Sequence, residues 1–283
     1  MDVRRRDRTR VKFTRRTYLV LTLILAISFL QWGVVSIMLE TRQKFQEFSI
    51  WCPITFCLAV ALFCVFILVG YIRSHIIFKW VMAVVIVELY VIAMFILVIT
   101  SWLPEVLVYF VICVLSMIVA LVIGCNLSFS MDMTQSIAPI FITCYILVAA
   151  SMYALMIHLY NVHPEPYAFM VFEIILHLVM LLLVMLHAQT IRGDRFIQMS
   201  TDDYLLAALL LYHEFLAIYA MTFYWQINYS FFTSKDFFWL STSIPGSTMR
   251  NPQTQPNIAP LDDIDAGSDY NLDFDDYDKK PSD

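Results

Sequence analysis

Long apolar runs dominate this sequence and restrict the chain to one class of fold. Seven of them lie at residues 17–39, 50–72, 77–99, 103–127, 135–159, 166–187 and 203–227. A helix needs about 20 apolar residues to cross the roughly 30 Å hydrocarbon core of a bilayer. Because the runs do not alternate between apolar and polar residues, they predict helices and not the strands of a membrane barrel. We therefore expect an all-α polytopic membrane protein with seven transmembrane helices.

The composition excludes several function classes. Hydrophobic residues make up 60% of the 283 residues and charged residues 14%, whereas soluble domains are about half apolar and about a quarter charged. This balance excludes a soluble enzyme domain and a nucleic-acid binder of the basic-patch type. The sequence also lacks phosphate-binding glycine loops, nucleophile elbows and zinc-protease motifs, so we expect neither an enzyme nor a cofactor. The six cysteines form no Cys-x-x-Cys pair and are better explained as buried apolar residues than as metal ligands.

The net charge of −5 is divided between the two ends of the chain. Residues 1–16 carry eight Lys or Arg, which predicts a basic cytosolic N-terminus by the positive-inside rule. The seven-helix transmembrane domain is expected over residues 17–232. Residues 233–283 are expected to form an interfacial aromatic segment and a disordered acidic tail. The side of the membrane occupied by the tail stays open, because a last span that stops short would return the tail to the cytosol.

Two local signals are expected to mark the ends of the spans. The tryptophans, Trp32 among them, fall near predicted span ends, where an indole can keep its N–H in contact with water. Before the last span, Ser200-Thr201-Asp202-Asp203 has the pattern of a capping box, with Ser200 as the N-cap and Asp203 at position N3.

Ionisable side chains at bilayer depth are costly to insert, so each one is a functional candidate. Glu214 and His213 are adjacent in the last span and point about 100° apart, so at least one must face the bundle interior, and we favour Glu214. Glu173 and His177 lie one turn apart in the sixth span. They either satisfy each other locally or form, with His187, one titratable face. The other candidates are Glu88 in the third span, Asp132 after the fourth and Arg73 at the end of the second.

Four short blocks follow one another along the chain. They are Phe13-Thr14-Arg15-Arg16-Thr17-Tyr18-Leu19, then Phe129-Ser130-Met131-Asp132-Met133-Thr134, then His187-Ala188-Gln189 with Gly193, and finally Ser200-Thr201-Asp202-Asp203-Tyr204 with Leu211-Tyr212-His213-Glu214. In type and order they resemble the signature of the transmembrane Bax inhibitor motif family, in its lifeguard (glutamate-receptor-associated) branch. The resemblance covers roughly residues 10–232.

The resemblance implies a fold, a location and a function. The family fold has six helices around a central seventh. Its members reside mainly in endoplasmic reticulum and Golgi membranes, and they are linked to passive calcium leak and to suppression of cell death. In the family, two Asp residues share a proton as a pH-sensitive latch, which an Arg contacts. Matching of the motifs places His187 and Glu214 at the latch positions and Arg73 at that of the Arg. Because imidazolium and carboxylate attract each other, this pair is expected to be less negative than two carboxylates.

These observations lead to a preferred function and an alternative. We expect a pH-sensitive calcium leak of an intracellular membrane, associated with calcium homeostasis and with negative regulation of apoptosis. The expected ion pathway and pH latch comprise His187, Glu214 and Arg73. The expected secondary stations are Asp132, Glu88, Glu173 and His177. The alternative is a non-conducting membrane protein that modulates cell death through helix or tail contacts, and a seven-helix ligand receptor is a third, weaker interpretation. The expected partners are the lipid bilayer, calcium or other cations, and membrane proteins of cell-death or calcium signalling.

Overall fold

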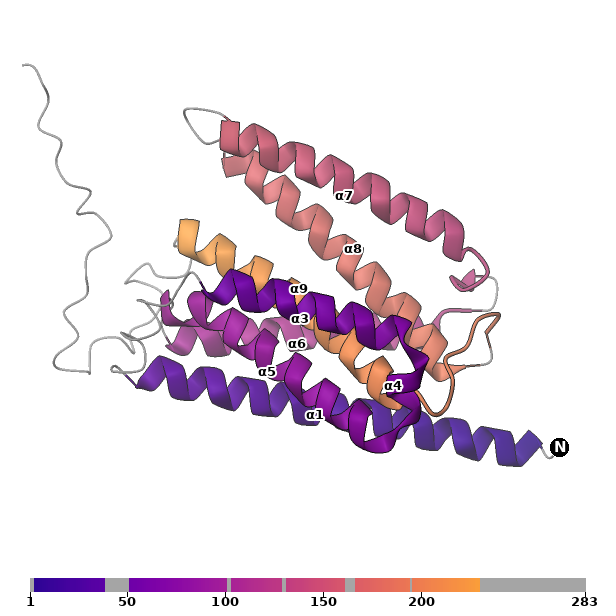
Figure 1. Cartoon of the computed structure of the whole chain (residues 1–283). Helices are drawn as coiled ribbons and strands as arrows, with labels where there is room; N and C mark the ends of the chain where they lie inside the picture. Colours follow the sequence, from indigo (N-terminus) through magenta and orange to yellow (C-terminus); the bar gives the residue numbers. More distant parts are fainter. Residues whose placement is uncertain are drawn as a thin grey trace, which may run out of the picture. The chain divides into compact units, whose positions relative to one another are not determined.

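The computed structural model describes residues 3–38, 51–100, 103–128, 131–160, 166–193 and 195–229, and its regular elements there are helices. They are α1 (Val3–Ile37), α3 (Trp51–Leu68), α4 (Gly70–Ser74), α5 (Ile76–Thr100), α6 (Leu103–Asn126), α7 (Ile137–Tyr160), α8 (Pro166–Arg192) and α9 (Tyr204–Tyr229) (Figure 1). Seven of these helices, all except the short α4, are long and apolar enough to cross a membrane. The predicted all-α polytopic fold with seven transmembrane helices is therefore confirmed.

The chain divides into two units, Met1–Ser234 and Lys235–Asp283. All eight helices belong to the first unit. The second unit contains most of the predicted interfacial segment and the Asp-rich tail, and it lies outside the described residues.

The helix ends differ from the predicted spans at several places. Helix α1 begins at Val3, so most of the basic segment predicted at 1–16 is helical and continuous with the first span. The second span is broken at Val69, which has an extended backbone and separates α3 from α4. Before α9, the Asp203 carbonyl accepts the Ala207 N–H at 3.0 Å. Asp203 is therefore the N-cap of α9, and the prediction of Ser200 as the N-cap was wrong.

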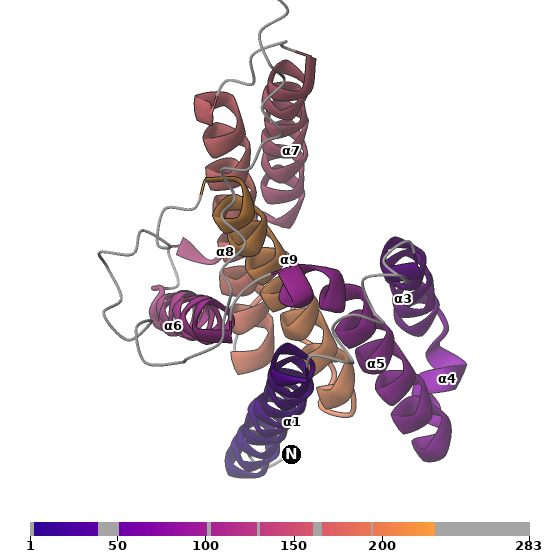
Figure 2. The ribbon, with the colours of Figure 1, turned by 90° about the vertical axis from the view of Figure 1, so that its left-hand side faces the viewer.

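Helix α9 is the central helix, as the resemblance implied (Figure 2). It packs against α1, α5, α6 and α8, while α3 packs on α5 and α7 packs on α8. An apolar helix surrounded by other helices is buried on every side. Accordingly, the buried residues of α9 occur on all of its faces: Leu205, Leu206, Ala207, Ala208, Leu209, Leu211, Tyr212, Glu214, Phe215, Leu216, Ile218 and Tyr219.

Three consecutive polar residues connect α9 to three of its neighbours. Successive side chains of a helix point about 100° apart, so Tyr212, His213 and Glu214 reach in three directions. Their partners are Ser28 of α1 at 2.7 Å, Tyr90 of α5 at 2.9 Å and His187 of α8 at 2.5 Å. The sequence reasoning required only one of His213 and Glu214 to face the interior, whereas both have a partner inside the bundle.

A close approach of α6 to α8 supports the same region. At Gly124 of α6, an added Cβ would lie 2.6 Å from the Met185 carbonyl oxygen and 2.9 Å from the Ala188 Cβ, both on α8. Only glycine fits this position without moving a helix, and small residues are a common means of bringing membrane helices together. The contact fixes the part of α8 that carries His187.

Trp32 lies in the core and not at a wet span end. Its side chain is fully buried, and its indole N–H donates to the Val91 carbonyl oxygen at 3.3 Å. The indole also stacks on Tyr219 of α9, with ring centroids 5.0 Å apart. The prediction for Trp32 was therefore wrong, because a backbone carbonyl of α5 replaces water as the acceptor.

Candidate functional site

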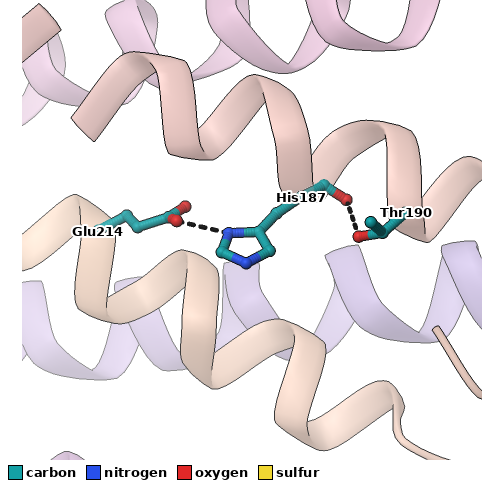
Figure 3. A network of polar contacts seen from close by, with 3 residues as sticks. All are labelled: His187, Thr190 and Glu214. Carbon is teal, nitrogen blue, oxygen red and sulfur yellow. Dashed lines mark hydrogen bonds and ion pairs between the residues drawn. The ribbon is translucent and has the colours of Figure 1, made fainter. Parts of the chain in front are cut away.

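A histidine of α8 and a carboxylate of α9 meet inside the bundle (Figure 3). The Nδ1 atom of His187 lies 2.5 Å from Oε1 of Glu214. At this distance one proton lies between the two atoms, and a hydrogen bond with an ionised partner is short and strong. The sequence assigned these two residues to the latch, and the structure brings them together across 27 residues of chain.

The His187–Glu214 pair uses only one of the two carboxylate oxygens of Glu214. The side chain of Glu214 is 5% exposed and that of His187 is 21% exposed. Oε2 of Glu214 is buried and has no hydrogen-bond partner among the described residues. A buried acceptor without a partner is costly. This oxygen can therefore take a proton, a water molecule or a cation.

The backbone of α8 next to the pair is held from several sides. The Thr190 hydroxyl donates to the His187 carbonyl at 2.9 Å (Figure 3). The Arg10 guanidinium of α1 donates to the carbonyls of Thr190 and of Met199, the latter at 2.5 Å. Cations near a helix C-terminus satisfy carbonyls that have no partner within the helix. These contacts fix the end of α8 and thereby the position of His187.

Arg73 lies elsewhere. Its guanidinium forms an ion pair with Asp203 at 3.7 Å, with side-chain exposures of 23% and 27%. Asp203 precedes α9, and Glu214 follows 11 residues later, which is about 16 Å along a helix axis. The interpretation of Arg73 as a direct contact of the latch is therefore corrected: Arg73 holds the N-terminus of α9.

Asp132 organises a loop outside the spans. Its carboxylate accepts the Thr134 hydroxyl at 2.7 Å and backbone N–H at 3.0 Å, and the Phe196 N–H at 3.4 Å. Burial alone would raise the pKa of this carboxyl. The hydrogen bonds from Thr134 and Phe196 and the charge of Arg195 outweigh burial and hold the pKa below its usual range. Asp132 thus connects the loop after α6 to the loop after α8.

Glu88 has a partner on another helix. The amide nitrogen of Gln31 of α1 lies 3.1 Å and 3.2 Å from the two carboxylate oxygens of Glu88 of α5. Neutral hydrogen-bond donors offset part of the insertion cost of a carboxylate.

Glu173 and His177 form a second polar cluster on α8. His177 Nδ1–H donates to the backbone carbonyl of Glu173 at 2.9 Å, and its Nε2 lies 3.1 Å from the Thr222 hydroxyl of α9. Glu173, His177 and Thr222 line a cavity of about 380 Å³. Glu173 and His177 therefore interact locally, as one of the two interpretations expected, but His177 contacts the backbone of Glu173 and not its carboxylate. The carboxylate of Glu173 remains at the wall of the cavity. Ten residues, or about 15 Å of helix, separate His177 from His187.

Sequence reasoning missed two residues next to these groups. Gln189 is fully buried, and its Oε1 accepts the Met133 N–H at 3.0 Å while its Nε2 has no partner among the described residues. Tyr90 bonds His213 and lies against its ring. Gln189 belongs to one of the blocks that carry the resemblance, whereas Tyr90 had no signal in the sequence.

The described residues contain no group of three or more His, Cys, Asp or Glu that could hold a metal ion. All six cysteines lie within the described ranges, and none of them forms a disulfide there.

Comparisons of the chain with family models, with curated proteins and with solved structures found no match.

Proposed function

We propose that this protein is a pH-sensitive leak for calcium or a related cation in an intracellular membrane, with His187 and Glu214 as the latch. The observation that carries the proposal is the buried Oε2 atom of Glu214, which has no hydrogen-bond partner in the described part of the chain, next to Oε1, which is bonded to His187. An intramembrane carboxylate of this kind is a functional group by default, because it costs stability and gains nothing from lipid.

The pair has two charge states that differ by one proton. When neutral His187 donates its Nδ1–H to the Glu214 carboxylate, the pair carries a charge of −1. When both ring nitrogens are protonated, imidazolium and carboxylate form a neutral pair. The neutral state contains an ion pair between α8 and α9, and the negative state contains only a hydrogen bond together with a free negative charge. Loss of the proton should therefore both weaken the α8–α9 contact and attract a cation.

The same interface carries the second polar cluster. His177 of α8 contacts Thr222 of α9. His177 lies before His187 on α8 and Thr222 lies after Glu214 on α9, so this cluster is displaced from the latch along both antiparallel helices. Glu173 lines the cavity beside it. Between the two clusters both helices carry buried apolar residues, such as Val184 and Ile218. A cation that passes from Glu214 to Glu173 would need these side chains to separate, which supports a slow leak and not an open pore.

The proposed cellular role rests on the resemblance to the Bax inhibitor motif family. It supports a location in the endoplasmic reticulum or Golgi membrane, and the basic residues 1–16 support a cytosolic N-terminus. A calcium leak there lowers the calcium store, which supports a role in calcium homeostasis and in negative regulation of apoptosis.

The test is calcium efflux from vesicles that contain the purified full-length protein, measured over a range of pH. Wild type should leak faster as the pH rises, because deprotonation makes the pair negative. Glu214→Gln should slow the leak and remove its pH dependence, and His187→Asp should shift that dependence. Asp202→Asn is the matched control, because it also replaces a carboxylate by an amide, but at an exposed side chain before α9 that has no place in the pathway, and it should keep the pH profile. If Glu214→Gln and His187→Asp both leave the flux and its pH dependence unchanged, the proposal fails.

A second candidate is a non-conducting membrane protein that modulates cell death through helix or tail contacts. The neutral form of the His187–Glu214 pair favours it, since a neutral pair attracts divalent cations weakly. Survival assays separate the two functions. A Glu214→Gln protein that still protects cells, together with loss of protection on deletion of residues 242–283, would support the second candidate.

A further inference from the structure

A groove with a basic end lies between α1, α5 and α9. Its volume is about 560 Å³, and Lys12, Arg15 and Arg16 of α1 line one part of it. These residues are spaced by three and four, so they project from one face of the helix. All three side chains are exposed. None of them has an ion-pair or hydrogen-bond partner within the part of the chain that the structure describes.

The acidic residues nearest in sequence to the groove do not neutralise it. Asp203 precedes the groove residue Tyr204, and its carboxylate is paired with Arg73 at 3.7 Å. Asp202 is exposed to solvent. Lys79 adds a further positive charge, because its ammonium lies 5.1 Å from the centroid of the Tyr204 ring. Within the part of the chain that the structure describes, the basic end of the groove therefore keeps its positive charge.

The same groove continues along an apolar surface. Leu19 and Leu23 follow Arg15 and Arg16 on the same face of α1 and are 60% and 52% exposed. Both lie within the first transmembrane helix. Arg16 and Leu23 are seven residues apart, which is about 10 Å along the helix. Trp80 and Tyr204 also line the groove, and such amphipathic rings prefer the depth of lipid headgroups.

We propose that this groove binds an anionic phospholipid, with the phosphate of its headgroup at Lys12, Arg15 and Arg16 and an acyl chain along Leu19 and Leu23. A phosphate group accepts hydrogen bonds from several cations at once, and Arg suits its geometry. A soluble anion would use only the basic end. Leu19 and Leu23, which continue the groove into the membrane, would contact an acyl chain. The groove therefore favours a ligand with an acyl chain over a soluble anion.

The orientation predicted from the sequence agrees with this ligand. A cytosolic N-terminus puts the groove in the cytoplasmic leaflet, where anionic lipids concentrate, and basic pockets between membrane helices on that side bind such headgroups. The lipid site does not depend on the proposed calcium leak.

The test uses the full-length protein in neutral detergent with phosphatidylcholine, titrated with phosphatidylserine and followed by native mass spectrometry. Arg15→Gln with Arg16→Gln removes two charges from the groove. Arg8→Gln with Arg192→Gln is the matched control, because it removes two exposed charges at the same end of the bundle without changing a residue that lines the groove. All four side chains are exposed, so folding should persist in both variants.

Wild type should retain phosphatidylserine in preference to phosphatidylcholine. The groove variant should bind it about thirtyfold more weakly, from about 1 kcal/mol for each cation near a charged headgroup. The control should bind like wild type, and added salt should weaken binding. Glycerophosphoserine, the same headgroup without acyl chains, should compete poorly.

Three results would overturn the proposal. Equal retention of the two lipids by wild type would show that the groove does not select charge. Equal losses in the groove variant and the control would assign the effect to overall charge. Effective competition by glycerophosphoserine would reduce the groove to a site for soluble anions.

Discussion

The same substitution at two glycines should change the stability of this protein in opposite directions. At Gly124 of α6, an alanine Cβ would lie 2.6 Å from the Met185 carbonyl oxygen, whereas ordinary contacts begin at about 3.4 Å. The atom it meets is backbone, so α6 and α8 must move apart by up to about 0.8 Å. At Gly33 of α1, an added Cβ would meet no atom within 4 Å among the described residues outside its own stretch of helix.

The magnitudes follow from packing and from helix propensity. Overpacking of a tight contact costs about 1–3 kcal/mol. Replacement of a mid-helix glycine by alanine gains up to about 1 kcal/mol. Gly124→Ala should therefore destabilise the protein by about 1–2 kcal/mol, because its clash with backbone lies in the upper part of the range. Gly33→Ala should stabilise it by up to about 1 kcal/mol.

Thermal unfolding of the full-length protein in detergent measures both effects. At about 2–4 °C per kcal/mol for a chain of this size, the midpoint should fall for Gly124→Ala and rise slightly for Gly33→Ala. Calcium efflux of Gly124→Ala provides a second readout, because the displaced part of α8 includes Ala188, the neighbour of His187. A midpoint for Gly124→Ala at or above that of wild type would refute the tight α6–α8 contact.

Three further predictions concern the polar groups. His187→Ala should destabilise the protein by about 3–5 kcal/mol, because it leaves the buried Glu214 carboxylate without its partner, whereas His187→Leu combined with Glu214→Leu should cost much less in the same unfolding assay. The pKa of Asp132 is lower in the folded state than its unfolded value of about 3.9. Its ionised carboxylate therefore stabilises the fold at pH values above about 3.9, and this stabilisation is lost as the pH falls through the folded-state pKa. Asp132→Asn should therefore make denaturation midpoints less sensitive to acid below about pH 4, and an unchanged acid sensitivity would contradict this role. Arg73→Ala should cost less than about 1 kcal/mol, because the Arg73–Asp203 pair is partly exposed, and a larger loss in chemical denaturation would show that Arg73 makes a stronger contact.

The number of transmembrane helices could be predicted because a bilayer sets the length of an apolar run. The ends were less predictable. α1 begins at Val3, since a basic sequence is a good helix former and nothing in it breaks the helix. The N-cap of α9 is Asp203 and not the predicted Ser200, because the local pattern of hydroxyls and carboxylates allows the helix to begin at more than one residue.

The burial of Glu214 could also be predicted, because the insertion cost of a carboxylate depends on its depth in the bilayer, and depth can be read from sequence. Its pairing with His187 was suggested only by the order of the family-like blocks. Contacts between helices depend on how each helix is rotated and placed, which the spacing of residues along one helix does not specify. For this reason the sequence indicated neither the Arg73–Asp203 pair nor the hydrogen bond from Trp32 to Val91.

The position of α9 in the chain also affects how the bundle is made. Tyr212, His213 and Glu214 take their partners from α1, α5 and α8, which are all synthesised earlier. Until α9 enters the membrane, Ser28, Tyr90 and His187 lack these partners in an environment without water. In the six earlier spans alone, Tyr90 and His187 thus lack their partners on α9, whereas the Ser28 hydroxyl still donates to the Ile24 carbonyl oxygen at 2.9 Å. A protein truncated before Tyr204 would remain in this intermediate state. Assembly of the whole domain therefore depends on the insertion of α9.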